Sequence, residues 1–337
     1  MNDRILITGS SGFIGKILSK ELSKKKVFLI DKKNQDDKKN FYNINLKNRK
    51  KLEDFFKKNK INTIIHLASE TFDNDEDIVY KDNIRAGKNL LFLAKKYKIN
   101  QFIFASTISI YEKNYNYLIK ESEEPSAKNK YGLSKIYIEK KLKTLKDINV
   151  TIFRLPIVIG KTRSHRMGIL FELIRKGLPI FLIDNGKNRI QFVSVDELNS
   201  AIKKTIGLKG FNIFNIGCIK SYSFRENLEY IVKKSKSKSK FFSLNKYFGL
   251  MVLNLLILLK LIDLHFYHKS FLTQNILLNL SKIKKKIKFK STISSRELFY
   301  SNYQHYVMNL KNTKNIKSGS DKNPSLKIFN LLNFFYK

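Results

Sequence analysis

Short apolar runs in this chain alternate with longer stretches whose apolar residues recur every three or four positions. The first run, Ile5–Ile7, is followed by Ile14, Leu18 and Leu22 at the spacing of one helix face. Runs that are apolar throughout are typical of strands buried on both faces of a parallel sheet. The pattern predicts an α/β fold with a doubly wound parallel sheet, whose strands include residues 5–7, 27–30, 63–69, 101–105, 150–155 and 211–217.

A glycine-rich turn separates the first predicted strand from the first predicted helix. Gly9 permits a tight turn, Gly12 lets the backbone approach a pyrophosphate, and Gly15 lets the helix pack closely on the strand. The amides of the helix N-terminus, around Phe13 and Ile14, favour phosphate charge.

The second strand ends in Asp31, near the expected distance of about 20 residues beyond the loop, where a carboxylate binds the adenosine ribose hydroxyls. The sequence therefore predicts a dinucleotide site, and a chance glycine turn in another α/β protein is the alternative.

The composition says more about the cellular location and the partners of the protein than about its chemistry. The chain has 337 residues, of which 42% are apolar, and a single cysteine, Cys218, which excludes a disulfide framework and favours a reducing, cytoplasmic location. Its formal charge of +38 suggests nucleic acid or an anionic membrane as a partner. Lysine supplies most of that charge, whereas a nucleic-acid reader favours arginine. We therefore attribute the charge to a generally lysine-rich composition, and we expect no specific nucleic-acid partner.

The spacing Gly9-x-x-Gly12-x-x-Gly15, preceded by Thr8, resembles the short-chain dehydrogenase/reductase superfamily, in particular its extended branch of sugar-nucleotide epimerases, dehydratases and reductases. The resemblance implies a Rossmann-type domain that binds NAD and a smaller, partly helical C-terminal substrate domain. By the same resemblance, further cofactor contacts are expected from Asn45 and Leu46, from Leu67, Ala68 and Ser69, and from Asn83 and Ser106.

A tyrosine and a lysine one helical turn apart are the candidate catalytic pair. Tyr131 and Lys135, at positions i and i+4, share a helix face, so an ammonium at Lys135 can lower the pKa of the phenol and hold a ribose hydroxyl. Without such help a tyrosine with a pKa of about 10 is a poor base at neutral pH. Thr107, at the carboxyl end of a predicted strand, would bind the same substrate oxygen.

Downstream motifs bear on the substrate. Arg189 stands where the family binds the nucleotide diphosphate, although a strand cap or a pair with Asp184 is the alternative. The substrate-binding asparagine and tyrosine of the family are replaced by Ile157 and Ile159.

The Asp-Glu pair that a 4,6-dehydratase needs after its threonine is absent, because Ile108-Ser109 follows Thr107. We expect an NAD-dependent nucleotide-sugar epimerase like the UDP-sugar 4-epimerases, with no metal. A reductase or dehydrogenase of a keto-sugar or lipid alcohol, or a non-catalytic RNA- or membrane-binding relative, remains an alternative.

The expected organisation places the NAD-binding domain in residues 1–155, with 190–217 returning to it. Residues 156–308 form mainly the substrate domain, and 309–337 a polar tail with a short apolar end. Residues 247–262 are nearly all apolar yet short for a ~30 Å hydrocarbon core. They predict a helix packed into the smaller domain or, alternatively, a peripheral membrane contact. The resemblance is also compatible with a homodimer.

Overall fold

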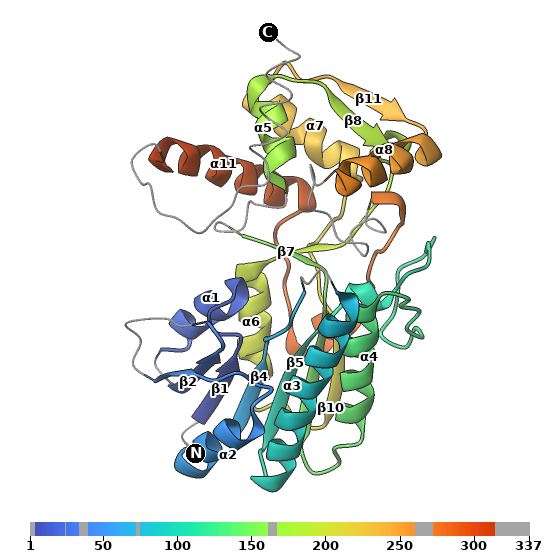
Figure 1. Cartoon of the computed structure of the whole chain (residues 1–337). Coiled ribbons are helices and arrows are strands. Elements are labelled where there is room, and N and C mark those ends of the chain that lie inside the picture. The colour runs from blue at the N-terminus through green and yellow to red at the C-terminus, as the bar shows by residue number, and fades with distance from the viewer. Residues whose placement is uncertain are drawn as a thin grey trace.

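A computed structural model describes residues 4–23, 25–33, 40–71, 75–160, 167–259 and 272–313. Its central sheet has seven strands in the order β10-β6-β5-β4-β1-β2-β3, and every neighbouring pair is parallel (Figure 1). The predicted doubly wound parallel sheet is confirmed. Its strands are β1 (Arg4–Thr8), β2 (Lys26–Asp31), β3 (Phe41–Asn43), β4 (Thr63–His66), β5 (Gln101–Thr107), β6 (Asn149–Leu155) and β10 (Phe211–Asn215).

Helices cover both faces of this sheet, which explains why its strands are apolar throughout. On β1, Leu6 packs into one apolar core, whereas Ile5 and Ile7 pack into the core on the opposite face. The first core lies under α2 (Arg49–Lys58), α3 (Glu76–Lys96) and α4 (Lys130–Lys143), and the second under α1 (Phe13–Glu21), α6 (Val195–Thr205) and α10 (Ser281–Ile287).

The chain reverses its direction of sheet building between β1 and β4. From β1 it adds β2 and β3 on one side, and it then returns to add β4, β5 and β6 on the other. The carboxyl ends of β1 and β4 therefore flank a topological switch point, the place where open α/β sheets bind ligands.

A smaller domain lies beyond the carboxyl ends of the strands (Figure 1). Its core packs α5, α7 and α11 against two short parallel pairs, β7 with β9 and β8 with β11. The elements are β7 (Ile157–Ile159), α5 (Gly168–Lys176), β8 (Ile180–Ile183), β9 (Phe192–Ser194), α7 (Phe224–Ser235), β11 (Phe241–Leu244), α8 (Lys246–Leu258) and α11 (Ser295–Thr313), with short 3-10 turns η1 (Ile108–Ile110) and η3 (Asp184–Gly186).

Two predicted segments are described only in part. Residues 260–262 of the apolar stretch 247–262 and residues 314–337 of the tail lie outside the described residues. Helix α11 continues through Thr313, past the expected start of a polar tail at residue 309.

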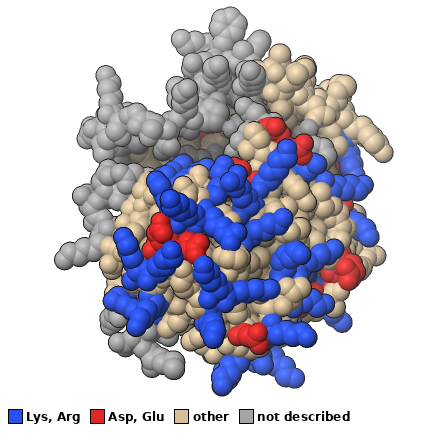
Figure 2. All heavy atoms as spheres, turned by 60° about the horizontal axis from the view of Figure 1, so that its bottom comes forward, with Lys and Arg blue, Asp and Glu red and all other residues tan. Residues whose placement is uncertain are grey.

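Basic side chains are spread over the surface. Figure 2 brings the lower end of the molecule forward and shows Lys and Arg side chains across that face, with Asp and Glu in small groups among them. In the described part of the chain several lysines pair with acids, such as Lys47 with Asp82 at 2.6 Å.

Candidate active site

The glycine turn after β1 is built so tightly that side chains cannot replace its glycines. Gly9 has φ +73°, and a Cβ atom there would lie 2.6 Å from the backbone nitrogen of Ala68, just beyond β4. A Cβ atom on Gly15 would collide with the carbonyl of Gly9, so this glycine lets α1 approach the turn. The loop therefore brings exposed backbone at Gly12 to the N-terminus of α1, where the helix favours phosphate charge.

Asp31 is fixed at the edge of this loop by backbone amides. Its two carboxylate oxygens accept hydrogen bonds from the amides of Ser11 and Lys33, both at 3.0 Å. Lys32, the next residue, pairs instead with Glu70. Each carboxylate oxygen keeps a second lone pair, so Asp31 can still accept from ribose hydroxyls.

The loop after β4 is held by a buried asparagine. The side-chain oxygen of Asn83, on α3, accepts the amide of Glu70 at 2.8 Å and lies 3.2 Å from the hydroxyl of Ser69. Its amide nitrogen donates to the hydroxyl of Ser134 on α4 at 3.3 Å. Asn83 thus connects the segment of Leu67, Ala68 and Ser69 to the helix that carries the candidate catalytic pair.

Asn45 and Leu46 lie just after β3. Asn45 is exposed, and its side-chain oxygen accepts the amide of Lys47 at 2.9 Å. Leu46 is buried, and its carbonyl accepts from Asn89 of α3 at 2.8 Å. An adenine amino group bound to Asn45 would therefore share the side-chain oxygen of Asn45 with the amide of Lys47.

The start of α4 is anchored against the end of β5. Asn129 caps the helix by accepting the amide of Gly132 at 2.6 Å, and its side-chain nitrogen donates to the carbonyl of Ser109 at 3.1 Å. Thr107 ends β5 and accepts the amide of Ser109 at 3.1 Å. The structure therefore holds Tyr131, between Asn129 and Gly132, close to the segment that carries Thr107.

Lys135 lies beneath Tyr131 in a low-dielectric setting. Its ammonium is 5.6 Å from the centre of the Tyr131 ring, 4.8 Å from that of Phe104, and donates to the carbonyl of Ala105 at 2.9 Å. Burial lowers the pKa of Lys135 to about 7, although the charge of Glu139 opposes this shift. The positive charge next to the phenol is therefore sensitive to pH near neutrality.

His66 is buried below the same region. Its Nδ1 lies 2.8 Å from the hydroxyl of Thr8, and its ring stacks on Phe104. Burial, followed by the charge of Lys135, lowers the pKa of His66 to about 3. His66 is therefore neutral at physiological pH and adds no second positive charge beside Lys135.

A buried ion pair between α4 and β6 was not recognised in the sequence. Glu139 accepts from Arg154 of β6 at 2.9 Å and from the hydroxyl of Ser106. Arg154 also donates to Tyr111 at 2.6 Å. Burial opposes the charge of Arg154, but the hydrogen bond and charge of Glu139 outweigh it and raise the Arg154 pKa. The available signal was spacing, because Glu139 follows Tyr131 and Lys135 at successive intervals of four.

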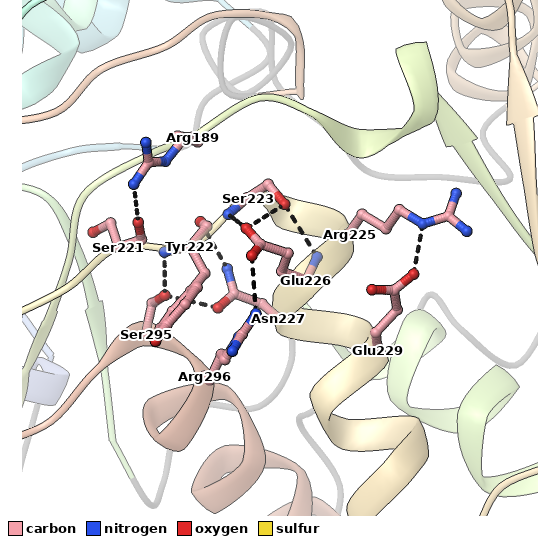
Figure 3. A network of polar contacts seen from close by, with 10 residues as sticks. All are labelled: Arg189, Ser221, Tyr222, Ser223, Arg225, Glu226, Asn227, Glu229, Ser295 and Arg296. Carbon is pink, nitrogen blue, oxygen red and sulfur yellow. Dashed lines mark hydrogen bonds and ion pairs between the residues drawn. The ribbon is translucent and has the colours of Figure 1, made fainter.

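Arg189 lies in the smaller domain, between η3 and β9. Its guanidinium donates to the carbonyl of Ser221 at 2.8 Å, and its amide donates to Asn275 at 2.8 Å. Among the described residues no ion pair joins it to Asp184. Figure 3 shows it beside the N-terminus of α7, and the residue is exposed. An exposed guanidinium with donors to spare can bind an anionic group.

The segment that Arg189 contacts is rigidly supported. Ser223 and Glu226 form a capping box at the start of α7, and Arg296 of α11 pairs with Glu226 at 2.9 Å (Figure 3). Ser295 accepts the amide of Tyr222 and donates to Asn227 at 2.7 Å. These bonds tie α7 to α11 and fix the backbone that receives Arg189.

These features fit a dinucleotide. The glycine turn forms a cradle that a Cβ atom would fill, Asp31 can accept ribose hydroxyls, and Lys135 is oriented from the helix above β5. NAD would be held by these residues at the switch point, and when bound it would supply a hydride acceptor.

Comparison with known proteins identifies the family and the fold. The sequence model of the NAD-dependent epimerase/dehydratase family matches residues 5–217. A dTDP-D-glucose 4,6-dehydratase of Dictyostelium discoideum is 31% identical, over 64% of this chain and 58% of its own length. A putative UDP-glucose 4-epimerase of Methanocaldococcus jannaschii is 28% identical, over 67% of this chain and 81% of its own.

Among solved structures, a UDP-glucose 4-epimerase of Thermotoga maritima with UDP-glucose has the same fold. Its TM-score is 0.73 at 21% identity, and the alignment covers 91% of this chain and 99% of that chain.

Proposed function

Because the chain belongs to the NAD-dependent epimerase/dehydratase family, an enzyme family, we propose that it is a nucleotide-sugar epimerase that inverts a sugar carbinol of a UDP-sugar. The observation that carries the proposal is the Tyr131–Lys135 pair, one turn apart on α4 and anchored beside Thr107. This pair is suited to moving a proton at a sugar hydroxyl.

The roles of the side chains follow from their positions. Tyr131 takes the proton from the sugar hydroxyl and later returns it. In its charged form Lys135 stabilises the phenolate of Tyr131, and Thr107 orients the reacting sugar oxygen. Bound NAD supplies hydride acceptance and return at the same carbon. Arg189 holds the nucleotide diphosphate from the smaller domain.

Dehydration is disfavoured despite the similarity to a 4,6-dehydratase. Within the resemblance, that chemistry needs an Asp-Glu pair after the threonine, and this chain has Ile108-Ser109. Both residues are buried in η1, where Ile108 carries no titratable group. No acid–base pair for loss of water is therefore supplied from this segment.

The cofactor preference and the cellular location are inferred from Asp31 and Cys218. We propose NAD as the preferred cofactor, because the carboxylate of Asp31 would lie close to a ribose 2′-phosphate. We also propose a reducing, cytoplasmic location, which the single buried thiol, Cys218, supports.

The deciding experiment follows the substrate without added cofactor. Purified protein is incubated with UDP-glucose, UDP-galactose and their N-acetylated counterparts, the sugars are identified by NMR, and the nucleotide released on denaturation is identified by mass spectrometry. An epimerase interconverts two sugars while its NAD is recycled. Tyr131→Phe should lower turnover by about 10²–10⁴-fold.

Tyr137→Phe is the matched control on the same helix, and it should leave turnover unchanged. In a parallel incubation of a nucleotide-linked keto-sugar with added NADH or NADPH, stoichiometric consumption of the reduced cofactor with a reduced sugar as product would instead identify a keto-sugar reductase. Full activity in Tyr131→Phe would contradict the proposed mechanism.

A further inference from the structure

Helix α8 is apolar around its whole circumference, yet it is hardly buried. Apart from Lys246 and Asn254, its 13 residues are apolar or aromatic or glycine, and Gly249 is the only one that is buried. A helix that is apolar on all sides is normally found inside a protein or in a membrane. Its exposure therefore needs a physical explanation.

The packing of α8 shows which side is unpartnered. Gly249 faces β8, where a Cβ atom would lie 2.8 Å from the side chain of Ile183. The opposite side carries Tyr247, Met251, Leu255 and Leu258 at intervals of four, four and three residues, which places them along one helix face. Their exposed fractions are 82%, 60%, 53% and 77%.

The neighbouring strand pair extends this apolar surface. Phe181 of β8 and Phe242 of β11 are register partners, and their rings stack with centres 5.5 Å apart. Both rings are about half exposed, whereas Ile180 and Leu182, which alternate with Phe181, are buried in the core of the domain. Figure 1 shows α8 beside this strand pair, in the part of the smaller domain remote from the seven-stranded sheet.

A basic segment precedes α8 in the chain. From the last turn of α7 to the first residue of α8, six lysines are exposed, and the sequence contains no Asp or Glu from residue 230 to residue 259. These lysines are Lys233, Lys234, Lys236, Lys238, Lys240 and Lys246. Apolar side chains next to clustered lysines are the two signals that together hold a protein on an anionic bilayer.

We propose that the α8 surface, defined as Phe181, Phe242, the exposed face of α8 and the six lysines, docks on the surface of an anionic lipid bilayer. The apolar side chains enter the interface between headgroups and acyl chains, and the lysines bind lipid phosphates. The helix lies along the membrane, because 13 residues span about 20 Å. Within the described residues no helix is long and apolar enough to cross a bilayer.

Charge favours a bilayer over a second copy of this chain. In a symmetric dimer through this surface, the six lysines of one copy would lie near the six of the other, and like charges in contact repel. An anionic bilayer supplies the opposite charge and an apolar layer at the same time.

The test measures the binding of the full chain to vesicles by co-sedimentation. The vesicles contain phosphatidylcholine alone or a 7:3 mixture with phosphatidylglycerol. We expect the wild type to bind the mixed vesicles and to lose at least tenfold in affinity on pure phosphatidylcholine. The triple variant Met251→Ser, Leu255→Ser, Leu258→Ser should bind at least tenfold more weakly without loss of thermal stability, because these side chains are exposed.

Two triple charge-reversal variants distinguish an effect of the basic segment from an effect of the overall charge of the protein. Lys236→Glu, Lys238→Glu, Lys240→Glu should abolish binding to the mixed vesicles. Lys50→Glu, Lys51→Glu, Lys58→Glu, on α2 and with the same change in charge, should bind as the wild type does. Equal losses in both variants would show that only overall charge matters and would overturn the proposal.

The oligomeric state in the absence of lipid is the second readout. We expect the same mass by light scattering for the wild type and the triple serine variant. A wild-type dimer that becomes monomeric in that variant, together with no vesicle binding, would show that a second copy covers the surface instead. Epimerase activity in solution is unaffected by either result, so this test and the test of the proposed function fail independently.

Discussion

Two helices of similar length, α4 and α8, have opposite relations between sequence and burial. α4 has 14 residues, and six of them are buried, including the charged Lys135 and Glu139. α8 has 13 mostly apolar residues, of which only Gly249 is buried. Burial in this protein is therefore decided by what surrounds a helix as well as by the helix's own hydropathy.

The surroundings differ in what they offer to the side chains. α4 packs beside α3 on one face of the sheet. There Glu139 binds Arg154 and Ser106, and Lys135 donates to the carbonyl of Ala105. Buried polar groups are tolerated when they are hydrogen-bonded. α8 meets a neighbour mainly on the side of β8, so its apolar outer face is left for a partner.

The largest expected effect on stability comes from the loss of Glu139, which removes the buried ion pair of α4. Glu139→Leu leaves the Arg154 guanidinium buried without its carboxylate, and this should lower the free energy of unfolding by about 3–5 kcal/mol. Urea denaturation followed by circular dichroism measures the change.

The matched control removes both charges. Because a buried ion pair can often be replaced by apolar side chains, Glu139→Leu combined with Arg154→Met should be more stable than Glu139→Leu alone. A double variant as unstable as the sum of the two single variants would show that the two residues do not act as a pair.

The second prediction compares equal truncations on the two helices. Ile138 of α4 is buried against Gly87 of α3, so Ile138→Ala should cost about 2–5 kcal/mol of unfolding free energy. Leu258 of α8 is 77% exposed, and Leu258→Ala should change the stability by less than about 0.5 kcal/mol. Thermal denaturation of both variants tests the contrast, and similar losses would show that α8 is covered in solution.

The sequence predicts the sheet and the turn well for a physical reason. Strands buried on both faces must be apolar, and the turn at Gly9 tolerates no other residue, so both leave unambiguous local patterns. The positions of Asp31 and Tyr131 follow from these elements. The Glu139–Arg154 pair was missed because its residues lie on separate elements, and a charged residue on a helix is usually exposed.

The position of α8 could not be predicted from its own residues. Hydropathy shows that the segment avoids water, but it does not distinguish a protein core from a lipid surface. The distinction depends on Gly249 and Ile183, whose contact orients the helix, and on the stacked Phe181 and Phe242 beside it. These contacts join segments that are far apart in the chain.

The last prediction, with the smallest effect for each step of its measurement, concerns the stability cost of Lys135, which is buried in α4. Its pKa is about 7 in the folded protein, against 10.5 for an ordinary lysine, so the unfolded chain binds one more proton between these pH values. Stability therefore rises with pH through this window, by up to about 1.4 kcal/mol per pH unit, and the full cost is present below pH 7. Lys135→Met should remove this slope and should be more stable than the wild type at pH 6, although inactive. Urea unfolding of both proteins at intervals from pH 6 to pH 10 gives the difference in slope, in which other titrating groups cancel. Parallel curves would show that Lys135 keeps an ordinary pKa, and the phenol of Tyr131 would then have a permanent cation beside it at neutral pH.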